Sequence, residues 1–219
     1  MKKIGLLFGM IFTTTLFFGQ DSIQNRECKR MLLFVGQELK IQNYAKAAMY
    51  YLRGEKLCGD YGAKEYKSMS QTLQNAIITE PDNSRKKLYT DTLLGVYDRM
   101  DEKGFYEESE SSKRATYIML SSAPDYKKAD QIYSRAFENN NKFNDAELTY
   151  YYYNLFTLFS ITSNEEKGTY KKRLISDYFI LSKKIERENF AATTQATLTS
   201  YFNNLVRSCE GMLHEVKVF

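Results

Sequence analysis

Very few residues in this chain can interrupt a helix. Its 219 residues include only 2 prolines, Pro81 and Pro124, and 11 glycines. That is too few turn-forming residues for a many-stranded sheet protein. The long stretches between them carry the helix-forming residues Lys, Glu, Ala and Leu. The sequence therefore predicts an all-α fold.

Apolar residues recur at helical spacing in successive segments, which predicts about nine helices. In the fourth of these, Leu88, Tyr89, Leu93, Tyr97 and Met100 form one apolar stripe. Short turns between the segments favour antiparallel neighbours. The first predicted helix is Arg26–Lys40, and the second begins at Asn43. The remaining predicted helices are Tyr61–Thr79, Ser84–Lys103, Tyr106–Ser121, Asp125–Glu138, Asp145–Ile161, Glu165–Glu188 and Gln195–Val216.

Two of these helices share a pattern of small, aromatic and small residues that resembles the second helix of a tetratricopeptide repeat. In that family such a helix packs its small face against a partner helix, so its neighbours must be helices too. The two signatures begin at Tyr44 and Tyr126, and their separation of 82 positions is not a multiple of the roughly 34-residue repeat. We therefore expect an irregular array. The patterned residues are Ala47, Tyr51 and Gly54 in one helix and Ala129, Tyr133 and Ala136 in the other.

The resemblance extends over nearly the whole chain. The segments NYAKAAMYY from Asn43, YTDTLLGVYDRMDEKG from Tyr89 and PDYKKADQIY from Pro124 together resemble a group of exported tetratricopeptide-like proteins of Bacteroidetes. This resemblance implies an irregular α-solenoid of antiparallel helix pairs over residues 21–219. It implies no particular reaction.

The first twenty residues have the organisation of a secretory signal peptide. Lys2 and Lys3 precede an apolar run from Ile4 to Phe18, and Gly19 follows. The run is too short to span a bilayer comfortably, and polar residues come after it. We expect cleavage near Gly19 or Gln20 and a periplasmic or outer-membrane-associated protein. An uncleaved amino-terminal anchor is the alternative.

Export would make the cysteines informative, because an odd count in an oxidising compartment predicts one disulfide and one leftover thiol. The three cysteines are Cys28, Cys58 and Cys209. Residues equally far from the turn of a helical hairpin face each other, and Cys28 and Cys58 are each fifteen positions from Asn43. The sequence therefore predicts a disulfide between Cys28 and Cys58 and a free Cys209.

The residues that usually carry chemistry are scarce. His214 is the single histidine, so a His-dependent nucleophile or a multi-histidine metal site has no members to recruit. The clustered carboxylates at Glu107–Glu110 and Glu165–Glu166 fall at helix starts, where negative charge is favourable for structural reasons. There is no Gly-rich phosphate loop. We expect a protein that is not an enzyme and that uses no cofactor or metal.

The charge pattern argues against nucleic acid as a partner. The formal net charge is +4, and the basic runs Lys171–Arg173 and Lys183–Lys184 are each followed by acidic residues along the same helix. No stripe of lysine and arginine stands alone.

The run Tyr150–Tyr153 is a candidate contact surface. Successive helix positions differ by about 100°, so four consecutive tyrosines cannot all be buried. Tyr153 and Phe156 then point toward the groove in which repeat stacks bind peptides, and simple packing within the protein is the alternative. This interpretation assumes a buried stripe of Leu148, Tyr151, Tyr152, Leu155 and Phe159.

A second candidate is Asp98 and Arg99, which form either an inter-helix ion pair or a ligand contact. Together these features predict a helical-repeat scaffold that binds a protein or peptide of the cell envelope on its concave face. The alternative is a glycan or small-ligand binder that uses the tyrosine-rich face. The absence of Trp weakens that alternative, because sugar rings usually stack on large aromatic faces.

Overall fold

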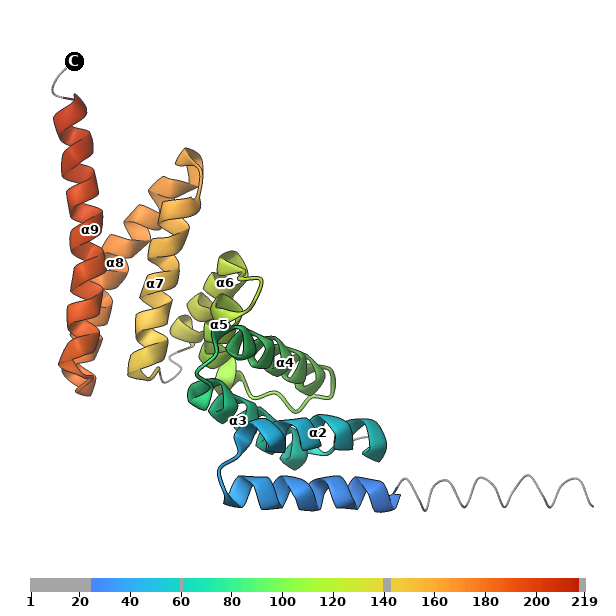
Figure 1. The fold of residues 1–219 in the computed structure, drawn as a ribbon. Coiled ribbons are helices and arrows are strands. Elements are labelled where there is room, and N and C mark those ends of the chain that lie inside the picture. Colours follow the sequence, from blue (N-terminus) through green and yellow to red (C-terminus); the bar gives the residue numbers. More distant parts are fainter. Residues whose placement is uncertain (1–24, 60, 140–142, 217–219) are drawn as a thin grey trace, which may run out of the picture. The chain divides into compact units, whose positions relative to one another are not determined.

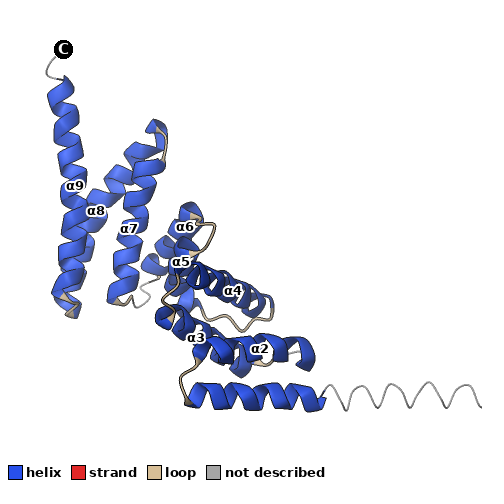
Figure 2. Ribbon diagram, viewed as in Figure 1, coloured by secondary structure: helices blue, strands red, loops and turns tan. Residues whose placement is uncertain are grey.

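The computed structural model describes residues 25–59, 61–139 and 143–216, with side chains described up to residue 207. Every regular element in these ranges is helical, which confirms the all-α fold (Figure 2). The helices are residues 25–40, α2 (Tyr44–Cys58), α3 (Ala63–Thr79), α4 (Asn83–Glu102), α5 (Ser111–Leu120), α6 (Tyr126–Glu138), α7 (Asp145–Ile161), α8 (Asn164–Glu188) and α9 (Ala192–Val216), and the 3-10 turn η1 (Glu108–Glu110) precedes α5.

The chain divides into two compact units, one ending at Phe105 and one beginning at Tyr106. In the first unit α3 packs against both α2 and α4 (Figure 1). Short connections make each of these neighbours antiparallel to α3, so α2 and α4 run parallel to each other. The core of this unit is formed mainly by side chains of α3 and α4, among them Tyr66, Met69, Leu73, Leu93 and Tyr97.

The helix of residues 25–40 and α2 form the predicted hairpin. The Asn43 side chain accepts a hydrogen bond from the Lys46 backbone N–H at 3.4 Å and so caps α2. At the open end of the hairpin, the Sγ atoms of Cys28 and Cys58 lie 2.06 Å apart in a disulfide, with their Cα atoms 5.0 Å apart. This is the pair that the symmetry about Asn43 predicts.

The second unit is built around α7, which packs against α5, α6, α8 and α9. The stripe predicted to be buried on α7 is buried, including Tyr151 and Tyr152. The Tyr152 hydroxyl donates to the Leu174 carbonyl at 2.9 Å, so this buried phenol is satisfied by the backbone of α8. The full stripe is Leu148, Tyr151, Tyr152, Leu155 and Phe159.

Two expectations about helices were wrong. The segment predicted as a helix from Tyr106 starts as extended chain, followed by η1, and α5 begins only at Ser111. Gly104, with a φ of 69°, ends α4, and Phe105 then turns back so that its ring lies 6.2 Å from that of Tyr66. Residues 105–107 are therefore not helical, and the acidic residues Glu108 and Glu110 lie in the 3-10 turn.

The second error concerns α4. Leu88 was placed on the apolar stripe of this helix, but its side chain is 60% exposed, while Leu93 and Tyr97 of the same stripe are buried. Leu88 is five positions before Leu93, or about 140° away around the helix at 100° per residue. It therefore faces a different direction, toward α2.

Candidate functional site

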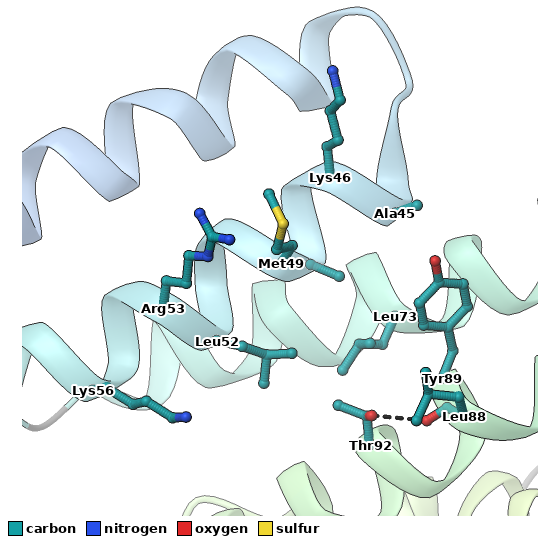
Figure 3. A pocket seen from close by; sticks show the side chains of 11 residues that line it. Ala45, Lys46, Met49, Leu52, Arg53, Lys56, Leu73, Leu88, Tyr89 and Thr92 are labelled. Atoms are coloured by element: carbon teal, nitrogen blue, oxygen red, sulfur yellow. Dashed lines mark hydrogen bonds between the residues drawn. The ribbon is translucent and has the colours of Figure 1, made fainter. Parts of the chain in front are cut away.

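A groove of about 500 Å³ lies between α2 and α4, with α3 behind it (Figure 3). Leu73 of α3 and Ala48 of α2 are buried at its base. Figure 3 shows Leu52 and Leu73 pointing toward the space above Thr92. The lining residues are Ala45, Lys46, Ala48, Met49, Leu52, Arg53 and Lys56 of α2, Leu73 of α3, and Leu88, Tyr89 and Thr92 of α4.

The groove exists because α2 and α4 each pack on α3, and small residues line the α2 wall near its start. Ala45 and Ala48 leave space that larger side chains would fill. On the opposite wall, the Thr92 hydroxyl donates to the Leu88 carbonyl at 2.7 Å. This bond turns the polar end of Thr92 back onto its own helix and leaves its methyl group for the groove. The inner surface is consequently apolar.

Positive charge follows the α2 edge of this groove. Lys46, Arg53 and Lys56 all line it, and none of them forms an ion pair with another described residue. At 100° per residue they fall within about 80° of one another around α2. None of the eleven lining residues is acidic. The site therefore combines an apolar base with one cationic edge.

An ion pair between α2 and α4 lies near the Lys56 end of the groove. Arg99 donates from Nε to Glu55 Oε1 at 2.7 Å and from Nη2 to Glu55 Oε2 at 3.1 Å. The Tyr66 hydroxyl donates to the same Oε1 at 2.7 Å. Burial, together with the Glu55 carboxylate, raises the pKa of Tyr66 to about 12. Arg99 is thus engaged in holding two helices together.

The candidate partner-binding residues lie on two helices, α4 and α7. Arg99 forms the inter-helix ion pair, which was one of its two predicted roles, and the adjacent Asp98 is exposed on α4. Tyr153 and Phe156 are half-buried on α7 and pack against Tyr201 of α9, with ring centroids 5.7 and 5.2 Å away. The contact with Tyr201 corresponds to the packing alternative for these two side chains.

The second unit contains a polar cluster between α6, α7 and α8. Arg173 donates to both carboxylate oxygens of Asp130, at 2.7 and 3.0 Å, and to Ser134 Oγ at 3.0 Å. The Tyr151 hydroxyl donates to Asp177 at 2.7 Å. Burial raises the pKa of the Asp177 carboxyl, although its bond from Tyr151 and the charge of Arg173 oppose that change. The polar atoms of this cluster are hydrogen-bonded to one another across α6, α7 and α8, so the cluster serves to pack these helices together.

Sequence reasoning missed the groove, although one signal for it was present. Leu88 and Thr92 are four residues apart on α4 and lie off the phase of the buried stripe that contains Leu93. An apolar residue out of phase with its helix marks a second contact face. The other wall could not be found in this way, because pairing α2 with α4 depends on how both pack on α3.

The described part of the chain also bears on metals and membranes. No group of three or more His, Cys, Asp or Glu side chains within it is arranged to hold a metal ion. None of its helices has a stretch long and apolar enough to cross a bilayer. Residues 1–20 and the side chains of Cys209 and His214 lie outside the described residues.

Comparisons of the chain with protein-family models, with curated proteins and with solved structures find no match. The tetratricopeptide-like family therefore stays a resemblance carried by sequence motifs. The groove of the first unit is the feature from which a function can be argued.

Proposed function

We propose that this protein is a helical scaffold of the cell envelope that binds a partner protein, and that the groove between α2 and α4 receives an apolar segment of that partner. One observation carries the proposal: Leu88 is 60% exposed at the edge of an apolar groove of about 500 Å³. Helix-lined apolar grooves are a recurring way to bind peptide segments.

The first unit is suited to presenting such a groove. The Cys28–Cys58 disulfide ties α2 to the preceding helix, and the Glu55–Arg99 pair ties α2 to α4. Both contacts hold the α2 wall in place before a partner arrives, which reduces the entropy lost on binding. The tyrosine run of α7 supports the glycan alternative less well, because Tyr151 and Tyr152 are buried in the core.

A photocrosslinking amino acid placed in the groove tests the proposal. We expect benzoylphenylalanine at position 88 to capture a defined envelope protein in living cells. Position 78 is the matched control, because Ile78 is also an exposed aliphatic residue of the first unit, at 73%, but does not line the groove. Identical capture patterns from positions 88 and 78 would contradict the groove as the binding site.

The location follows from the predicted signal peptide and is supported by the disulfide, since disulfides persist in oxidising compartments. Mass spectrometry of the protein recovered from the periplasm should give an amino terminus near Gln20 or Asp21. Recovery of a chain that still carries Lys2 would favour the uncleaved anchor.

A further inference from the structure

We infer that the segment received by the groove is an amphipathic helix with acidic residues along one edge. This inference rests on the proposed function and adds the chemistry of the partner. It has three supports: the spacing of the cations on α2, the absence of carboxylates from the lining, and the apolar base between two parallel helices.

The cations are distributed along the groove. Lys46 and Lys56 are ten residues apart on α2, which corresponds to about 15 Å at 1.5 Å per residue, and Arg53 lies between them. A ligand that satisfies all three must carry negative charges spread over a similar length. About three turns of helix with carboxylates at i, i+7 and i+10 or i+11 match that spacing.

The same distribution decides between a protein segment and a lipid. A lipid places its charge in one headgroup and its apolar chains away from it, so it would be matched by cations gathered at one end. Here an apolar surface including Met49 and Leu52 runs beside the whole row of charges. An amphipathic helix has this arrangement, with apolar side chains on one face and charges beside them.

Charge complementarity specifies acidic residues. Lys46, Arg53 and Lys56 have no ion-pair partner among the described residues, so carboxylates can approach them without displacing an existing contact. Basic residues at those places would face like charges, which disfavours the wrong partner. The groove thereby selects by charge as well as by its apolar base.

Three labelled peptides of about 18 residues test the inference, a length that gives roughly five helical turns. All carry the same leucine face, and they differ only in having Glu, Gln or Lys along one edge. Binding to the full mature protein is followed by fluorescence anisotropy at low and high salt. We expect the Glu peptide to bind about tenfold more tightly than the Gln peptide at low salt, with the difference shrinking as salt is added.

Two triple variants test whether the preference for the Glu peptide depends on the cations of the groove. Changing Lys46, Arg53 and Lys56 to Gln should remove the preference for the Glu peptide. The matched control changes Lys29, Lys64 and Lys172 to Gln, which are exposed outside the groove and lower the net charge equally, and it should leave the preference intact. A preference lost equally in both variants would overturn the inference, since overall charge would then explain it.

Leu88→Asp separates the inference from the proposed function. Leu88 is exposed, so the fold should survive, which circular dichroism checks. Loss of all peptide binding in this variant, with equal wild-type affinity for Glu and Gln peptides, would overturn the acidic partner and leave the groove as a binding site. Peptide binding unaffected by Leu88→Asp would overturn both. Displacement of the Glu peptide by anionic phospholipid vesicles, lost in the groove triple variant, would replace the helix with a lipid as occupant.

Discussion

The two units use the same bidentate arginine contact to join helices, but they balance its charge differently. In the first unit Arg99 meets one carboxylate, Glu55, which also accepts from Tyr66. In the second unit Arg173 binds Asp130 while a second carboxylate, Asp177, lies close enough to be affected by its charge. In the second unit the single positive charge of Arg173 therefore acts on two carboxylates. Helix packing in the second unit thus accommodates a second, half-buried carboxylate, to which a tyrosine hydroxyl donates.

The units also differ in covalent support, since the described part of the second unit contains no counterpart to the Cys28–Cys58 disulfide of the first. That bond closes a loop with a sequence separation of 30. Four changes test these differences, and the bond itself should have the largest effect.

Replacing Cys28 and Cys58 together by Ser should lower the free energy of unfolding by about 3 to 4 kcal/mol, because the unfolded chain regains the entropy of the open loop. Urea unfolding under non-reducing conditions measures the change. Cys209→Ser serves as the control and should have little effect if that thiol is free, as predicted. Equal losses in the two variants would show that Cys209 takes part in the bond.

Arg173→Met should cost about 3 kcal/mol, because Asp130 is left buried without its counter-charge and Asp177 loses a favourable neighbour. Arg99→Met should cost less, about 1 to 2 kcal/mol, since only Glu55 is left and Tyr66 still donates to it. Arg187→Met is the control, as its side chain is 76% exposed and its pair with Glu188 lies on the surface. A larger loss of stability for Arg99→Met than for Arg173→Met would contradict the difference in charge balance between the two units.

The two signature helices give the third test. Gly54 occupies the position that Ala136 takes in the other signature, and a Cβ atom there would collide with the Tyr61 hydroxyl, which donates to the Tyr51 carbonyl at 2.9 Å. Gly54→Ala should therefore cost about 1 to 3 kcal/mol through overpacking. Gly36→Ala, at a helical glycine with nothing nearby, should instead stabilise by about 0.5 to 1 kcal/mol. Thermal melting of both variants decides, and a gain in stability for both would refute the close packing.

The signatures also show what the sequence could predict. All their members are buried, so the pattern located one packing face on α2 and one on α6 correctly. It could not say which neighbour that face meets. The Tyr51 hydroxyl donates to Ser68 of the following helix at 2.6 Å, whereas Tyr133 bonds Thr116 of the preceding helix, also at 2.6 Å. Local spacing specifies the face, while the choice of partner depends on contacts between segments far apart in the chain.

The candidate site was less accessible to prediction for the same reason. The disulfide followed from symmetry about a single turn, which is local. The groove needs α2 and α4, two helices separated in sequence by α3, and the contact of Phe156 with Tyr201 needs α9 to pack on α7. Hydrophobic periodicity within one helix carries no information about either pairing.

Asp177→Asn should have the smallest effect, about 0.5 to 1 kcal/mol, and it tests the two-acid side of the comparison. Burial raises the pKa of Asp177 in the folded state above its ordinary value of 3.8. Between those two pKa values the folded protein binds more protons than the unfolded chain, so this group lowers stability as pH rises through that window. The variant should therefore be more stable than wild type at neutral pH and lose this advantage near pH 3.8.

Urea unfolding across this pH range measures the difference in stability. Tyr151→Phe, which removes the hydroxyl that donates to Asp177, should destabilise wild type more than the Asp177→Asn variant at neutral pH. If the stability of wild type and of Asp177→Asn changed in parallel with pH, Asp177 would ionise without penalty. The polar cluster of the second unit would then differ from the Glu55–Arg99 pair of the first unit only in which residues it contains.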